Sequence, residues 1–180
     1  YESIMEPVRF DNEVERREAV AIDRLVSIRT LQEAYKTENR RFLSSTDSLI
    51  DFYKNGQITI VRQIGSMDDS VAVAEGRVSR DSIRIFVRDT LLKGKANLID
   101  SISFIPYSGG KRIHMESVVR KVSGIEIPLF EATIPYDDLL NGLDRQLIVN
   151  LKAEKEDMKQ YTGLKVGDIE NPNNNAGNWE

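Results

Sequence analysis

His114 is the side chain best suited to acid–base chemistry, because the 180-residue chain has one histidine and no cysteine. The lack of cysteine excludes thiol catalysis, disulfides and thiolate zinc sites. Alternate residues of a strand share a face, so Arg112 and Glu116 lie on the same face as His114. A catalytic imidazole needs a positioned nucleophile or carboxylate, and the sequence shows only that Glu116 is near. We therefore predict an ordinary solvated or half-buried strand histidine.

Acidic pairs are the next candidates for chemistry. Asp68–Asp69 and Asp137–Asp138, with Asp144 nearby, carry carboxylates of the kind used in glycoside hydrolysis or calcium binding. Adjacent residues of a strand or helix point in different directions, however, so adjacency alone does not build a shared site. We predict turn and helix-cap roles for these residues, and we assign no catalytic, cofactor-binding or metal-binding residue.

The segment 154–180 is polar and carries the only tryptophan close to its end. Its stretch GDIENPNNNAGN has closely spaced oxygen ligands near Asp168 and Glu170, but it lacks the alternating pattern of an EF-hand loop. Such a tail can stay disordered or dock through Trp179, and we favour docking because an indole buries enough apolar area to hold it. A bound calcium ion is the less favoured hypothesis.

Neither phosphate nor nucleic acid is an expected ligand. The stretch SGGK at 108–111 is too short for a phosphate loop and lies between two predicted strands, so it indicates a hairpin. Four arginines are spaced along one segment, namely Arg77, Arg80, Arg84 and Arg88. Asp81 and Asp89 interrupt them, no aromatic platform accompanies them, and the net charge of the chain is −4. These features predict a solvated sheet face and no nucleic-acid partner.

The elements that hold these residues begin with a long amphipathic helix over residues 12–36. Its apolar stripe comprises Val14, Ala21, Leu25, Ile28 and Tyr35. Asp11 or Asn12 is the predicted N-cap, with Glu15 as the capping-box partner of Asn12. Because Pro7 precedes this point, we expect the helix to start afresh and not to continue an upstream helix.

The remaining elements predict a mainly antiparallel sheet. A short helix over 45–54 ends at Asn55-Gly56, and the sheet region extends from 57 to 153. Alternating apolar positions mark its strands, at Ile58/Ile60, Val71/Val73, Ile83/Ile85/Val87, Ile113/Met115 and Ile125/Ile127/Leu129. Turns at 108–110 and 123–124 indicate an antiparallel meander from 97 to 134.

A helical turn near 136–143 and a last strand at 146–153 follow, and YTGLKVGDI is expected to add another short strand. Length and composition fit one α+β domain over residues 1–180, with the long helix packed on the sheet.

The start of the chain bears on its compartment. The sequence begins at Tyr1 and not at Met, so we expect a fragment or a processed product. No run approaches the roughly 18 apolar residues of a membrane-spanning helix, and no signal-peptide pattern is present. A removed leader or anchor upstream of Tyr1 explains both observations, although a removed cytosolic leader or tag explains the first equally well. The absence of cysteine fits the cytosol and the periplasm alike.

The end of the long helix carries a family resemblance. IRTLQEAYKTENRRF at 28–42, the following SSTDSLIDF and the ending AGNWE at 176–180 resemble type IV pilins and type II secretion pseudopilins at their helix-to-head transition and C-terminus. The matching residues at the transition are Gln32, Ala34, Tyr35, Phe42 and Leu49. The resemblance implies a hydrophobic helix half in, or extracted from, the inner membrane, and an extracytoplasmic β-sheet head packed on the helix. This chain lacks the hydrophobic half, has a longer sheet region, and carries Pro7 where a pilin helix is continuous.

The residues themselves suggest how the chain is held at the corner where it leaves the long helix. We predict that Tyr35 and Phe42 pin the helix end on the sheet, while Gln32 satisfies a backbone group beneath the corner. The leading hypothesis is a non-enzymatic, membrane-tethered periplasmic domain with a structural or interaction role, similar to a pilin, whose partner is another protein or further copies of itself. The alternative is a small-molecule-binding or metal-binding module, or a hydrolase that uses Asp or Glu.

Overall fold

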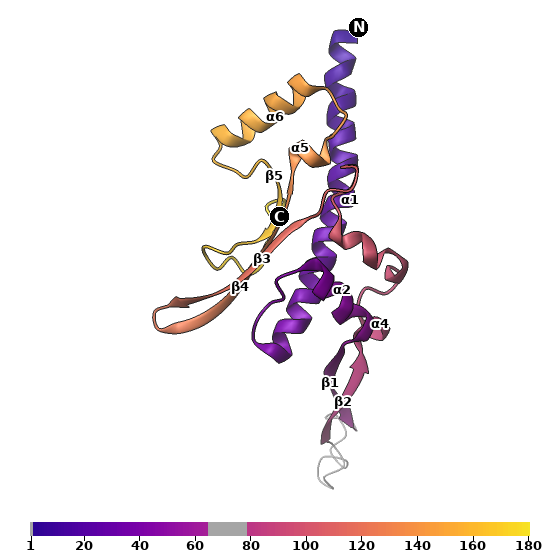
Figure 1. The fold of residues 1–180 in the computed structure, drawn as a ribbon, viewed down its shortest axis with the longest axis vertical. Helices are drawn as coiled ribbons and strands as arrows, with labels where there is room; N and C mark the ends of the chain where they lie inside the picture. Colours follow the sequence, from indigo (N-terminus) through magenta and orange to yellow (C-terminus); the bar gives the residue numbers. More distant parts are fainter. Residues whose placement is uncertain (1, 65–78) are drawn as a thin grey trace, which may run out of the picture.

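The fold is α+β, as the sequence predicts, and it is built around one long helix (Figure 1). A computed structural model describes residues 2–64 and 79–180. The helical elements are α1 (Glu2–Asn39), α2 (Thr46–Asn55), α4 (Val87–Thr90), the 3₁₀ helix η1 (Ala96–Ser103), α5 (Tyr136–Leu139) and α6 (Arg145–Asp157). The strands are β1 (Gln57–Ile64), β2 (Ser79–Phe86), β3 (His114–Val122), β4 (Ile125–Pro135) and β5 (Gly163–Gly167).

The strands form two separate antiparallel sheets. β1 pairs with β2, whereas the second sheet has the strand order β3-β4-β5. Figure 1 shows α1 as the long axis of the molecule, with the three-stranded sheet, α5 and α6 to one side and α2, α4, β1 and β2 to the other. The two groups of elements are therefore joined through α1.

The start of α1 differs from the prediction. α1 begins at Glu2 and passes through Pro7, so the predicted fresh start at Asp11 or Asn12 is wrong. A proline removes one i→i−4 hydrogen bond and crowds the preceding turn, but little more than one turn lies upstream of Pro7. Phe10 is buried, so the apolar stripe already favours helix ahead of the polar residues that resemble an N-cap.

The buried face of α1 supplies the centre of the core. Its fully buried apolar residues are Ala21, Leu25, Ile28 and Leu31. They belong to one hydrophobic cluster that also contains Phe130 and Ile134 of β4. α1 contacts α2 and η1 as well as α5, β4 and β5, so this single stripe holds elements from both sides of the molecule together.

Gln32 fixes the path of the chain after α1. Its Nε2 donates a hydrogen bond of 2.7 Å to the carbonyl oxygen of Leu43, and its Oε1 accepts one of 2.8 Å from the backbone N–H of Leu43. The side chain is fully buried, and Nε2 also lies 3.4 Å from the Met115 sulfur. The prediction that Gln32 satisfies a backbone group at this corner is confirmed, and the side chain satisfies two.

The two aromatic residues of the corner have different partners. Phe42 packs on Phe130 of β4, with ring centroids 4.8 Å apart, so it does pin the corner on the sheet. Tyr35 instead makes an edge-to-face contact with Phe52 of α2 at 5.3 Å. The prediction is therefore right for Phe42 and wrong for Tyr35, because the Tyr35 ring packs on a residue of α2 and not on the sheet.

Several predicted elements are confirmed. α2 starts where Ser45 accepts a hydrogen bond of 3.1 Å from the Ser48 N–H, and it ends before Gly56 as expected. Ser123 and Gly124 have positive φ values of 54° and 82° and turn β3 into β4. β5 lies within the expected stretch YTGLKVGDI and pairs with β4.

The predicted meander from 97 to 134 is wrong at its start. Residues 96–103 form η1, because Ile99 and Ile102 are buried at a spacing of three, which suits a 3₁₀ helix and not a strand. Val87, predicted as the end of a strand, is buried in α4. The strand expected around Val71 and Val73 lies outside the described residues.

The strand predicted at 146–153 is also wrong, since these residues lie in α6. Alternate apolar residues at 147, 149 and 151 suggested a strand, but Val149 is 44 % exposed and does not belong to a buried face. Ile148 is buried in its place, with Leu147 and Leu151 packed beside it. This is a helical repeat, and Asp144 reinforces it by accepting a hydrogen bond of 3.0 Å from the Leu147 N–H.

The C-terminal segment is docked, as favoured from the sequence. Its backbone pairs with β5 through hydrogen bonds from the Gly167 N–H to Ala176 and from the Asn178 N–H to Lys165. Trp179 is half-buried and packs against the hydrophobic core. The C-terminal residues are thus attached to β5 along its free edge.

Truncating Leu25 or Ile28 to alanine should lower the free energy of unfolding by roughly 2–5 kcal/mol, because each fully buried side chain leaves a cavity. Chemical denaturation followed by circular dichroism measures the change. Val119→Ala is the control, since Val119 is 55 % exposed and its loss should cost no more than about 0.5 kcal/mol. Unchanged midpoints for both buried variants would mean that α1 does not pack on the sheet.

Replacing Gln32 by leucine should cost about 2–4 kcal/mol, because the N–H and the carbonyl of Leu43 lose their partner inside the core. Amide hydrogen exchange at Leu43 should become faster at the same time. Thr30→Val is the matched control, because the Thr30 hydroxyl bonds only to the Val26 carbonyl within α1. The proposed role of Gln32 fails if the two variants are equally stable.

Candidate functional site

His114 is exposed at the start of β3. Its Nε2 lies 2.7 Å from a carboxylate oxygen of Glu116, the neighbour expected from the strand repeat. Arg112, also expected on this face, pairs instead with Asp47 at 2.6 Å. The prediction of a solvated strand histidine is confirmed, and a surface pair of this kind contributes little to stability.

The acidic residues 137 and 144 hold α6 in place. The carboxylate of Asp137 accepts from Lys152 at 2.8 Å and from Arg145 at 2.9 Å, and these bonds lower its pKa. Asp144 caps α6, as its predicted cap role requires. Asp138 lies beside Asp137 in α5, whereas Asp68 and Asp69 lie outside the described residues.

The C-terminal carboxylates do not converge on a cation site. Asp168 Oδ1 accepts hydrogen bonds from the backbone N–H groups of Glu170 and Asn171, and its Oδ2 lies 3.5 Å from Lys165 Nζ. Partial burial opposes ionisation, but these donors outweigh it and hold the pKa of Asp168 below its usual value. Among residues 2–64 and 79–180, no three His, Asp or Glu side chains are grouped as metal ligands. This arrangement gives the calcium hypothesis no support.

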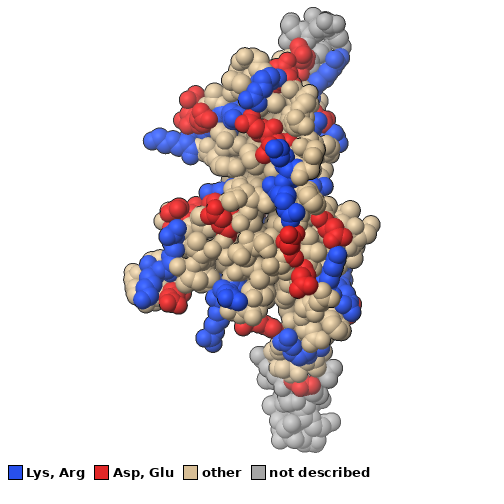
Figure 2. All heavy atoms as spheres, viewed as in Figure 1, with Lys and Arg blue, Asp and Glu red and all other residues tan. Residues whose placement is uncertain are grey.

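The arginine-rich segment is engaged with its own surroundings. Arg84 forms an ion pair of 2.9 Å with Glu38, and Arg88 donates to the Lys54 carbonyl at 2.6 Å. Arg77 and the side chain of Arg80 lie outside the described residues. Figure 2 shows basic and acidic side chains interspersed over the visible face, without a broad area of one sign.

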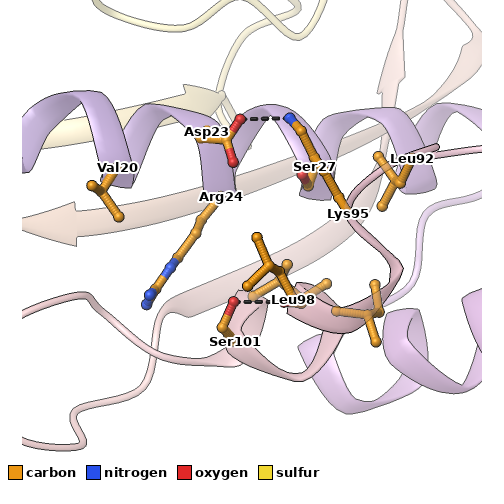
Figure 3. A pocket seen from close by; sticks show the side chains of 10 residues that line it. Val20, Asp23, Arg24, Ser27, Leu92, Lys95, Leu98 and Ser101 are labelled. Carbon is orange, nitrogen blue, oxygen red and sulfur yellow. Dashed lines mark hydrogen bonds and ion pairs between the residues drawn. The ribbon is translucent and has the colours of Figure 1, made fainter.

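Several hollows border α1, and one of them lies between α1 and η1 (Figure 3). Its volume is about 180 Å³. An ion pair of 2.5 Å between Asp23 and Lys95 crosses it, while Arg24 points away from this pair and donates to the Phe104 carbonyl at 2.6 Å. These contacts attach η1 and the loop after it to the helix, so the hollow has a structural explanation.

A second hollow, of about 300 Å³, lies on the other edge of the α1 stripe. We call it the Glu18 hollow, and the side chains that define it are Glu18, Tyr136, Lys155, Tyr161, Lys165 and Trp179. Glu18 is half-buried, and burial raises its pKa above the usual value despite the opposing charge of Lys155. The Tyr136 hydroxyl donates to Glu18 Oε2 across 3.4 Å, and its own pKa is raised, chiefly by burial.

Five separate parts of the chain build this hollow, including α6, which supplies Lys155. Glu18 comes from α1, and Tyr136 begins α5 where the backbone N–H of Tyr136 donates to the Thr162 carbonyl at 3.0 Å. Tyr161 and Lys165 come from the approach to β5 and from β5 itself, and Trp179 comes from the docked C-terminal segment. The hollow therefore exists only once β5 and the C-terminal segment have joined α1.

Sequence reasoning missed every side chain that defines the Glu18 hollow except Trp179. The one available signal was the position of Glu18, four residues after Val14 and three before Ala21, which places a carboxylate at the edge of the apolar stripe. Tyr136 and Tyr161 gave no comparable signal, because only the pairing of β4 with β5 brings them together.

No protein-family model, curated protein or solved structure matches this chain. Its function is therefore argued from the geometry described above.

Trp179 should emit at a shorter wavelength than free aqueous tryptophan, because its half-buried indole packs on the core. Arg29→Met should shift the emission toward that of free tryptophan, since Arg29 holds Glu180 at 2.7 Å and the Asn175 carbonyl at 3.1 Å. Calcium and chelator should change neither spectrum. Arg16→Met is the control, because Arg16 pairs with Glu13 within α1. Emission like free tryptophan in the unaltered protein would refute the docked segment.

Proposed function

We propose that this chain is a non-enzymatic extracytoplasmic domain with a structural or interaction role, similar in plan to pilins and pseudopilins. In this proposal a segment upstream of Tyr1 tethers it to a membrane. The observation that carries the proposal is the course of α1, which runs as one helix from Glu2 to Asn39 and projects beyond the rest of the molecule at its N-terminal end (Figure 1).

Continuity through Pro7 supports the tether. The sequence suggested that Pro7 separates this chain from the continuous helix of a pilin, but α1 has no break there. Glu6, Pro7, Val8 and Arg9 are all exposed, so the head leaves this end of the helix uncovered. A helix that continued upstream along the same axis would move away from the head without disturbing its packing.

Among the described residues, none of the helices is both long enough and apolar enough to cross a membrane.

The residues that carry the family resemblance also support a head packed on a helix. Gln32 and Phe42 hold the chain that leaves α1, and Leu49 of α2 is fully buried. Trp179, from the AGNWE ending, packs on the core beside β5. Contacts of this kind are what a helix-to-head transition requires.

The partners of the candidate catalytic groups support a role without catalysis. Asp137 is bound by two cationic side chains and Asp144 by a backbone donor, so both carboxylates serve α6. His114 is exposed on a strand with Glu116 as its partner. These groups are on different elements, and none of them lines the Glu18 hollow.

The codons upstream of Tyr1 should encode a run of about 20 apolar residues that continues α1. The natural full-length protein should then sediment with membranes, resist extraction by alkaline carbonate, and be cleaved by protease added outside spheroplasts. Residues 2–180 alone should remain in the supernatant and serve as the control. An initiating Met a few residues upstream, or a full-length protein that stays in the supernatant, would contradict the proposal.

A further inference from the structure

The Glu18 hollow contains side chains that a tethered structural role does not explain. Three aromatic side chains, Tyr136, Tyr161 and Trp179, line it together with one carboxylate. That carboxylate is half-buried, and its hydrogen bond to the Tyr136 hydroxyl is long, at 3.4 Å. A desolvated carboxylate held by one long hydrogen bond is poorly compensated.

The chemistry of these groups favours a positively charged organic ligand. A cation placed beside Glu18 replaces part of the hydration that the carboxylate lost, and the attraction is stronger in a partly dry hollow than in water. The faces of tryptophan and tyrosine rings attract ammonium groups through their quadrupoles. A carboxylate and several aromatic rings around one small space are therefore complementary to an ammonium group that carries apolar carbon.

We propose that the Glu18 hollow binds a small organic ammonium cation, with Glu18 as its counter-ion and Trp179, Tyr161 and Tyr136 as aromatic walls. This inference goes beyond the tethered structural role and does not depend on it. The volume of about 300 Å³ is at the lower end of small-molecule sites, so it suits an ammonium head group and not a large ligand.

The two lysines of the hollow differ in how far their charges are compensated. Lys165 Nζ lies 3.3 Å from Glu131 and 3.5 Å from Asp168, so its charge is matched by carboxylates. Lys155, in contrast, has no ion pair with another described residue, and its charge acts on Glu18 from α6. A bound ammonium ion therefore competes with Lys155 for the charge of Glu18, so removal of the Lys155 charge should strengthen cation binding.

Trp179 is the only tryptophan, so its emission reports occupancy of the hollow in the unaltered protein. Choline and n-butylammonium are the probes, and 3,3-dimethyl-1-butanol is the neutral isostere of choline. We expect a saturable change in Trp179 emission with at least one cation and none with the alcohol. Binding of choline alone points to a quaternary ammonium metabolite, and binding of n-butylammonium alone points to a lysine side chain as the natural source.

Matched variants separate the charge of Glu18 from the shape of the hollow. Glu18→Gln should weaken cation binding roughly tenfold or more, because the isosteric amide has no charge. Glu15→Gln, on the same helix but outside the hollow, should leave the affinity unchanged. Lys155→Met should raise the affinity for the cation, whereas it would lower the affinity for an anionic ligand. Circular dichroism verifies that each variant is folded.

The pH dependence supplies an independent measurement, because choline keeps its charge at every pH. Burial raises the pKa of Glu18, Lys155, Tyr136 and Glu15 also act on it, and Tyr161 and Lys165 are the other ionisable groups that line the hollow. Affinity should rise as pH increases through that raised pKa, where Glu18 becomes ionised, and the rise should vanish in Glu18→Gln. The proposal is overturned if neither cation changes the emission up to roughly 50 mM, if the alcohol acts as strongly as choline, or if Glu18→Gln binds equally well.

Discussion

The pairing of the Gln32 side chain with the backbone of Leu43 determines how the rest of the chain meets α1. An amide group reproduces both halves of a backbone hydrogen-bond pair, so it can hold an irregular segment inside a core where water is absent. Once Leu43 is held, Phe42 reaches Phe130 of β4 and Ser45 is placed to cap α2. One polar side chain in the apolar stripe thus directs the sheet to one flank of α1 and α2 to the other.

The sequence predicts best those elements whose signal is local. The stripe from Val14 to Ile28, the Ser123-Gly124 turn and the helix stop at Asn55-Gly56 each depend on a few neighbouring residues, and each was predicted. The errors arise where two local signals compete. Asp11 and Asn12 resemble a helix start, but burial of Phe10 upstream outweighs them.

Competing signals also explain the strand expected at 146–153, where an alternating pattern and a helical pattern share the same leucines. Burial of Ile148 in place of Val149 decides between the patterns, and that depends on tertiary contacts which periodicity does not contain. The Glu18 hollow is less predictable still, because its walls come from five separate parts of the chain. In the sequence, only the position of the Glu18 carboxylate at the edge of the stripe indicated the hollow. A charged side chain beside buried leucines needs either water or a partner.

The contact between Arg29 and Glu180, which are 151 residues apart, also has a consequence for the order of folding during synthesis. α1 is synthesised before the elements that contact it: α2, β1 and η1 follow before residue 104, whereas β4 and β5 follow only from residue 125 onward. The contact of Arg29 with Glu180 closes a loop of 151 residues, so loop-closure entropy is lost before this long-range contact can compensate it. The part of α1 that faces β4 and β5 therefore stays uncovered until these strands have been synthesised, and apolar surface exposed in this way favours aggregation during folding.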